Sequence, residues 1–311
     1  ETRSAILKMI NRFINYLRYE RNLSPLTLEH YEHDLNDFQT YFKKRDNHLC
    51  WQATADDEIS VDADIIRDWM ESMMDKGNKA TSINRRLSAL RSFYRFAIAR
   101  GLVGHDPAHT VRGPKKNKPL PVYVREGALD QLIDRPEMWN DSYKGIRART
   151  IIILLYETGI RVSELTGLDN VSVDFSQHQL KVTGKRNKQR IVPFGGELEA
   201  VLQTYIRVRN EYFERLTVAD EPLLIDDHGK RMTYAQVYKI VKQQLGKVTT
   251  QKKRSPHVLR HSFATAMLNH EAGLESVRKL LGHESVATTE IYTHTTFEQL
   301  KRVYKNAHPR A

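Results

Sequence analysis

The sequence predicts a mainly α-helical protein of two domains, with a small β-sheet in the second domain. Apolar residues recur at helical spacing over most of the 311 residues. Three short β-like runs lie between residues 171 and 193, around a turn typical of a hairpin. A basic, proline-rich stretch near residue 115 interrupts the helical pattern and separates the two domains.

Residues 1–111 predict a domain of four helices. The first apolar stripe runs from Ile6 to Leu17. Ser24-Pro25 is typical of a helix cap followed by proline at the first helical position, and this second helix continues to Phe42. A third helix is expected over Ile65–Met74, and a fourth begins near Thr81 and closes at Gly101.

Residues 112–121 form the predicted linker. Three prolines, one glycine and a basic cluster leave no apolar pattern there. The second domain, residues 122–311, begins with an apolar helix over Ile146–Thr158 that ends at Gly159. Strands are expected at 171–174, 179–183 and 190–193, with the hairpin turn at 184–189. Further helices are expected near 196–214, 233–246, 257–270, 274–281, 285–291 and 297–306.

Charge narrows the class of partner. Lys and Arg total 49 against 38 Asp and Glu, which gives a formal net charge of +11. Such a surplus favours nucleic acid as the partner, with an anionic membrane surface as the second candidate. The membrane is disfavoured because the sequence has no run of about 18 apolar residues. A start without signal-peptide features and the single Cys50 together predict a cytoplasmic protein without an internal disulfide.

Three segments of the second domain carry candidate chemistry. His257 and Arg260 lie three apart at the start of a predicted helix, so both can meet one anion. Arg161 stands at a helix corner after Gly159, and Glu164 can brace it or cap the next helix. His283 follows a Leu-Leu-Gly sequence and precedes Tyr292 by nine residues. Each segment alone also fits a structural role.

Together the segments resemble the tyrosine recombinase (phage integrase) family. The family's pattern is an Arg in a TGxRxSEL segment, a hairpin Lys, HxLRH, LGH, and then a Tyr nine residues later. In order, this chain offers Arg161 within Thr158–Leu165, Lys185 in the Gly184 turn, His257–His261, Gly282-His283 and Tyr292. The segments LSPLTLEHYEHDLNDF and NRRLSALRSFYRFA also look like the N-terminal DNA-binding domain of the XerC/XerD branch. The resemblance covers nearly the whole chain.

The resemblance implies a chemistry that these residue types can perform. Arg161 and Arg260 would clamp the non-bridging oxygens of a DNA phosphate, and His257 would manage the proton of the nucleophile. His283 would donate a further hydrogen bond. Tyr292 would attack the phosphorus, and Lys185 on the hairpin would protonate the leaving 5′-oxygen. Because a Gly often follows the first hairpin Lys in the family but Arg186 stands here, Lys188 is the alternative to Lys185.

The resemblance also implies how DNA is bound. The helical first domain and the catalytic second domain would form a C-shaped clamp around a double-stranded recombination site, with the basic linker crossing the backbone. Phosphate contact is the expected role of the remaining candidates, which are Arg85, Arg86, Arg91, Lys115, Lys116, Lys118, Lys239 and Lys242. The cycle needs no cofactor, and the sequence has no phosphate-binding glycine loop and no convincing metal-ligand cluster.

The expected function is site-specific DNA recombination through a 3′-phosphotyrosyl intermediate, as in Xer-type chromosome dimer resolution. A homo- or hetero-tetramer at synapsis is implied, and a DNA translocase is a possible activator. An integrase of a mobile genetic element is the alternative within the family. Outside it stand a type IB topoisomerase, which the Xer-like first domain disfavours, and a DNA-binding protein without catalysis, which the full residue set disfavours.

Overall fold

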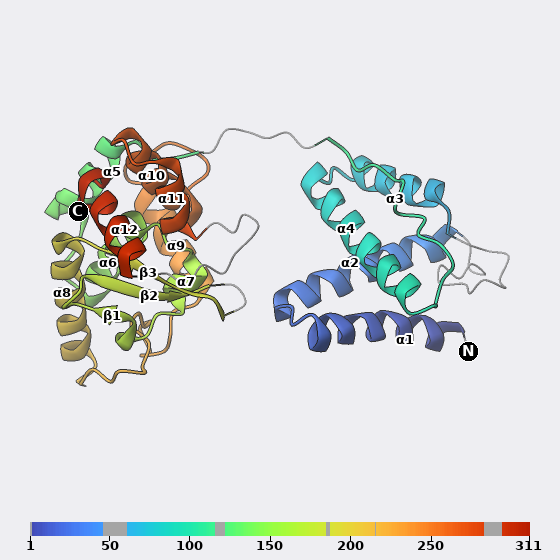
Figure 1. The fold of residues 1–311 in the computed structure, drawn as a ribbon, viewed down its shortest axis with the longest axis horizontal. Helices are drawn as coiled ribbons and strands as arrows, with labels where there is room; N and C mark the ends of the chain where they lie inside the picture. The colour runs from blue at the N-terminus through green and yellow to red at the C-terminus, as the bar shows by residue number, and fades with distance from the viewer. Residues whose placement is uncertain (1, 46–60, 116–121, 185–186, 215, 283–293) are drawn as a thin grey trace. The chain divides into compact units, whose positions relative to one another are not determined.

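Figure 1 shows the computed structural model, in which the chain divides into two compact units, residues 1–119 and 120–311. The structure describes residues 2–45, 61–115, 122–184, 187–214, 216–282 and 294–311. The predicted fold class, mainly helical with one small sheet, is confirmed. No helix within these ranges is both long and apolar enough to cross a bilayer.

Unit 1 packs its helices around an aromatic core. Its elements are α1 (Thr2–Asn15), a π-helical turn (Tyr16–Glu20), α2 (Pro25–Arg45), α3 (Ala63–Asp75) and α4 (Ala80–Ala99). Phe13 meets Phe93 edge-on at 5.6 Å between ring centroids, and Phe38 meets Trp69 at 4.8 Å. All four rings are almost fully buried. The apolar stripes of α1–α4 therefore face one another, as helical periodicity requires.

Unit 2 contains eight α-helices and the sheet among its described residues. The helices are α5 (Glu126–Asp134), α6 (Tyr143–Thr158), α7 (Val162–Thr166), α8 (Gly196–Tyr212), α9 (Tyr234–Leu245), α10 (Pro256–Asn269), α11 (Leu274–Leu281) and α12 (His294–Ala307). The predicted helix at 285–291 lies outside the described residues. α12 packs on its own unit, because Leu300 and Tyr304 are buried in a cluster with Phe263 and Leu280.

The sheet is antiparallel in the order β1 (Val173–Asp174), β2 (Gln179–Thr183) and β3 (Gln189–Pro193). The β2–β3 hairpin places Leu180 opposite Val192, and both are buried. The first strand is shorter than the predicted 171–174. Residues 170–172 form a 3₁₀ turn instead, because the side chains of Asp169 and Ser172 cap that turn reciprocally.

α6 is the central helix of unit 2. Every residue from Thr150 to Thr158 is buried, and the helix contacts α8, α9 and α10. A helix that is covered on all sides loses its polar stripe, which explains the long apolar run in the sequence. Because α6 is fixed over its length, the chain leaving its end enters α7 from a defined position.

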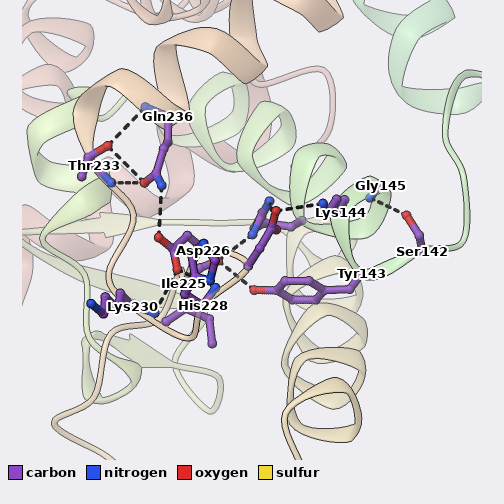
Figure 2. A network of polar contacts seen from close by, with 12 residues as sticks. Ser142, Tyr143, Lys144, Gly145, Ile225, Asp226, His228, Lys230, Thr233 and Gln236 are labelled. Carbon is purple, nitrogen blue, oxygen red and sulfur yellow. Dashed lines mark hydrogen bonds and ion pairs between the residues drawn. The ribbon is translucent and has the colours of Figure 1, made fainter.

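A polar network holds the other end of α6 (Figure 2). The hydroxyl of Tyr143 donates to the carbonyl of Ile225 at 2.7 Å. Asp226 in the same loop accepts a hydrogen bond from the side-chain amide of Gln236 at 3.1 Å, and Gln236 caps α9 together with Thr233. The network therefore joins the start of α6 to the start of α9 through one loop.

Gly159 ends α6 in the left-handed conformation, with φ of 61°. A Cβ atom at this position would stand 2.5 Å from Cδ1 of Phe263 and 2.9 Å from Cδ2 of Leu281. Both the backbone angle and the close approach of α10 and α11 therefore require glycine here.

We expect Gly159→Ala to lower the free energy of unfolding of unit 2 by roughly 2–4 kcal/mol, through backbone strain and overpacking. Urea denaturation measures the change. Gly127→Ala is the control, since a Cβ there meets open space within α5; it should be neutral or stabilise by up to about 1 kcal/mol. Equal midpoints for the two variants would contradict the packing argument.

Candidate active site

The backbone carbonyls at the C-terminal end of α11 accept the hydrogen bonds around which the site is built. An α-helix leaves its last carbonyl groups without intrahelical partners. Gly282, with φ of 63°, turns its N–H back to the carbonyls of Arg278 and Lys279. The three following carbonyls receive arginine side chains from other elements.

Each of these arginines comes from a different part of unit 2. Arg161 precedes α7, Arg190 lies on β3 and Arg260 lies on α10. Their contacts are Arg190 Nε to Leu280 O at 3.2 Å, Arg260 Nη2 to Leu281 O at 2.6 Å, and Arg161 Nη2 to Gly282 O at 3.1 Å. Guanidinium groups thus cap the negative end of the helix dipole.

Glu164 is the buried carboxylate that joins two of the arginines. It accepts hydrogen bonds from Arg190 at 2.7 and 3.0 Å and from the Arg161 side chain at 3.0 Å. It also accepts the Arg161 backbone N–H at 2.7 Å, which caps α7. Burial raises its pKa, but the hydrogen bonds and charge of Arg190, together with the hydrogen bonds of Arg161, outweigh burial and lower the pKa below the ordinary value. Glu164 therefore both caps α7 and braces Arg161, the two roles that the sequence left open as alternatives.

Arg260 is the most deeply buried cation of the site. It donates to Gly159 O at 2.7 Å as well as to α11, so it joins the end of α6 to the end of α11. Burial, followed by the charges of Arg161 and Arg190, lowers its pKa to about 10. Arg260 is therefore still a cation at neutral pH, held where charge is costly.

His257 lies one turn before Arg260 on α10. Burial lowers its pKa below the ordinary value, and three cations lower it further: Arg260, Lys253 and Arg161. The same effects of burial and nearby charge lower the pKa of His261. At neutral pH the His257 imidazole is therefore mainly neutral, and a neutral imidazole can accept a proton.

The site carries more positive than negative charge. Three guanidinium groups surround one carboxylate, and Lys253 stands near enough to act on His257. Part of this charge is open to solvent, since the Arg161 side chain is 38% exposed. Such an arrangement is completed by an anion with several oxygen atoms, such as a phosphate group. No group of three or more potential metal ligands occurs within the described ranges.

The structure brings together four of the predicted site residues: Arg161, Glu164, His257 and Arg260. The other three, Lys185, His283 and Tyr292, lie outside the described residues. His283 directly follows Gly282, so the chain toward Tyr292 starts at the capped end of α11. Lys188, the alternative hairpin lysine, is exposed, and its carbonyl accepts the Gly184 N–H at 2.7 Å.

The candidate phosphate-contacting residues lie in varied environments. Arg85 and Arg86 pair with the buried Asp34, and Arg91 donates to the backbone carbonyls of Ala108 and Val111. Lys115, Lys239 and Lys242 are exposed, the last two on α9, while Lys116 and Lys118 lie outside the described residues. The contacts of Arg91 give it a structural task within unit 1.

Sequence reasoning missed Arg190 and Lys253. Arg190 lies in a segment that the sequence predicted only as a strand of the sheet. Lys253 belongs to the basic run 252–254 just before the predicted helix of His257, and that proximity was the available signal. No comparable signal marks Arg190, because its partners are backbone carbonyls and a carboxylate on other segments.

Comparison with known proteins identifies the class. The sequence model of the phage integrase family matches residues 123–299, and that of the phage integrase N-terminal SAM-like domain matches residues 10–101. Tyrosine recombinase XerC of Chlorobaculum parvum is 36% identical, over 99% of this chain and 96% of that protein. Tyrosine recombinase XerD of Staphylococcus aureus (strain N315) is 34% identical, over 97% of this chain and 99% of that protein.

Solved structures show the same fold. XerH site-specific recombinase bound to a palindromic difH substrate has a TM-score of 0.69 and 21% identity, over 94% of this chain and 83% of that chain. A lambda integrase (residues 75–356) dimer bound to a COC′ core site has a TM-score of 0.65 and 17% identity, over 91% of this chain and 98% of that chain.

The chain therefore belongs to the phage integrase family, and it is a site-specific recombinase of the tyrosine class. The predicted family and enzyme class are thus confirmed.

We expect Glu164→Gln to lower the free energy of unfolding by about 3 kcal/mol at neutral pH, because it leaves the buried Arg190 and the half-exposed Arg161 without their carboxylate. The pKa of Glu164 is lowered on folding, so its contribution is complete above the ordinary value of 4.5 and is lost as pH falls through the folded value. The variant should therefore lose less stability than wild type on acidification. Urea unfolding at several pH values measures both effects.

Glu211→Gln is the matched control. Glu211 pairs with Arg207 on the exposed surface of α8, so its removal should change the free energy by no more than about 0.5 kcal/mol. If the two variants behaved alike, Glu164 would not be the carboxylate that holds the site.

Proposed function

We propose that this enzyme cuts and rejoins DNA through a covalent bond between Tyr292 and a backbone phosphate. The observation that carries the proposal is that Arg161 and Arg260, two of the three arginines bound to the last carbonyls of α11, are fixed at the point where the chain continues toward Tyr292. A phosphodiester gains negative charge on its non-bridging oxygens during attack. Fixed guanidinium groups stabilise that charge without reorganising.

The proposed cycle balances as two phosphoryl transfers. The hydroxyl oxygen of Tyr292 attacks the phosphorus, and the bond from phosphorus to the 5′-oxygen breaks. His257 takes the proton of the tyrosine, and Lys185 gives a proton to the departing 5′-oxygen. The phosphate stays on Tyr292 as a 3′-phosphotyrosyl ester. The 5′-hydroxyl of another strand then gives its proton to Lys185 and attacks this ester. The bond from phosphorus to the Tyr292 oxygen breaks, and His257 returns a proton to the tyrosine, which restores the backbone and the starting enzyme.

Arg161 and Arg260 retain donors for this task. A guanidinium carries five N–H groups, and the described contacts of each side chain use only part of them. Arg161 is the more exposed of the two, so it is the arginine expected to meet the phosphate first. His283 would add a donor beside it.

The proposed biological role is Xer-type resolution of chromosome dimers in the cytoplasm. The support is the similarity to XerC and XerD proteins over nearly the whole length of each chain. Such a role implies that unit 1 and unit 2 clamp a double-stranded recombination site, that a tetramer forms at synapsis, and that a DNA translocase is a possible activator. Integration of a mobile element is the alternative role for the same chemistry.

We expect wild-type protein to form a covalent adduct with nicked DNA that carries its recombination site, in EDTA and without ATP. Denaturing gels detect the adduct. Tyr292→Phe should form none, because it lacks the attacking oxygen, while binding the same DNA with unchanged affinity. An adduct that persists in Tyr292→Phe would refute the assignment of the nucleophile. Tight binding to a cognate site without any adduct from wild type would favour a non-catalytic DNA-binding protein.

We expect the cleavage rate at limiting DNA to fall on acidification, with a midpoint below the ordinary histidine pKa. The reason is that His257 must be neutral to accept a proton, and its lowered pKa keeps it neutral to lower pH. Lys253→Gln removes a positive charge near His257, so the midpoint should move to higher pH.

Lys252→Gln is the control for that shift. Lys252 carries the same charge one residue away but does not contribute to the lowered pKa of His257. It should leave the midpoint in place. A midpoint that moved equally in both variants, or that His261→Gln removed, would count against His257 as the base.

A further inference from the structure

We propose that Arg190 is a positioning residue that sets the direction in which the chain leaves α11 toward His283 and Tyr292. It does not touch the substrate; it acts through the backbone at Leu280–Gly282. This inference rests on the proposed role of Tyr292 as nucleophile. It goes beyond that role by assigning a task to an arginine of β3.

All three nitrogens of the Arg190 guanidinium are engaged within the protein. Nε donates to Leu280 O at 3.2 Å, and Nη1 and Nη2 donate to the two oxygens of Glu164 at 2.7 and 3.0 Å. Its side chain is 9% exposed, against 38% for Arg161. Arg190 is therefore directed at α11 and Glu164, whereas Arg161 keeps a surface that a phosphate can reach.

The guanidinium also lies against the backbone of Gly282. A Cβ atom on this residue would stand 3.0 Å from Nε and 3.1 Å from Cδ and Cζ of Arg190. Gly282 has φ of 63°, so the chain turns out of the helix at the residue that the Arg190 side chain contacts. The planar side chain limits the ways in which this turn can be made.

Glu164 transmits the constraint to the phosphate clamp. Its carboxylate is shared by Arg190 and Arg161, so the arginine that holds α11 is tied to an arginine proposed to hold the phosphate. Glu164 thereby links the direction in which the chain leaves Gly282 to the position of the proposed phosphate. In-line attack requires this relation, and an error of about 1 Å costs on the order of 100-fold in rate.

Arg190→Lys tests the inference. Lysine keeps the charge but cannot make the bidentate contact and reach Leu280 O in the same geometry. The matched control is Arg147→Lys. Arg147 is also buried, and it too donates to one carbonyl and one carboxylate, Ile225 O at 3.0 Å and Asp227 Oδ1 at 3.0 Å. It lies 12 residues before Gly159, about 18 Å along a helix axis.

The melting temperature of both variants should fall by a few degrees, because each variant loses the hydrogen bonds of one buried guanidinium group. Arg190→Lys alone should cleave nicked DNA more slowly, by about 100-fold at saturating protein and well below the unfolding temperature. The DNA dissociation constant should be unchanged in both. A rate for Arg190→Lys equal to that of Arg147→Lys would overturn the proposal. Arg190→Gln, which retains a planar donor, serves as the second variant if lysine prevents folding.

A measurement without catalysis separates this inference from the proposed function. Spin labels at Ser285 and Gln203, in a Cys50→Ser background, report the distance from the nucleophile segment to α8. The distance distribution should broaden in Arg190→Lys and remain as in wild type in Arg147→Lys. An unchanged distribution in Arg190→Lys would refute the positioning role even if wild type formed no adduct. An absent wild-type adduct with a broadened distribution would instead refute only the proposed reaction.

Discussion

Three hydrogen bonds from arginines to the last carbonyls of α11 hold the candidate site of unit 2 together. The donors come from the α7 corner, from β3 and from α10, and no two of them are neighbours in sequence. The central helix α6 places Gly159 beside α10, the hairpin carries Arg190 to the same point, and α7 brings Glu164 beneath it. The small sheet therefore contributes directly to the site, because Arg190, one of the three cations, lies on β3.

The convergence has an electrostatic cost. Burial weakens the hydration of these cations and like charges at short range repel, so the pKa of Arg260 falls to about 10. Glu164 and the helix carbonyls compensate only in part. The surrounding apolar core, above all the buried length of α6, supplies the stability that allows the cations to stay together. The phosphate proposed to bind at this cluster would complete the compensation.

Much of the fold could be predicted from the sequence, since helical periodicity and the hairpin turn act locally. The strand at 179–183 and the helix at 274–281 have the predicted bounds. α5 was not predicted, although Leu129, Leu132 and Ile133 have helical spacing. Prediction succeeded where neighbours along the chain decide the structure.

The site divides in the same way. Arg161, Glu164, His257 and Arg260 could be proposed because their segments together resemble a family pattern, although each segment alone also fits a structural role. Arg190 was not found, because a backbone carbonyl has the same chemistry at every residue and leaves no mark in the sequence. The contacts of Arg91 with Ala108 and Val111 were hidden for the same reason. Tertiary structure decides whether an arginine binds backbone carbonyls of its own chain or remains available to contact DNA.

The scattered origin of the three arginines bears on how the protein is made. Residues 161, 190 and 260 and the α11 carbonyls leave the ribosome one after another, and Tyr292 follows them all. A nascent chain that has exposed Arg161 and the hairpin still lacks α10, α11 and the attacking tyrosine. A partial product of translation that ends before Gly282 therefore lacks part of the cluster, and the proposed DNA cleavage would arise only once unit 2 has been synthesised through Tyr292 and has folded.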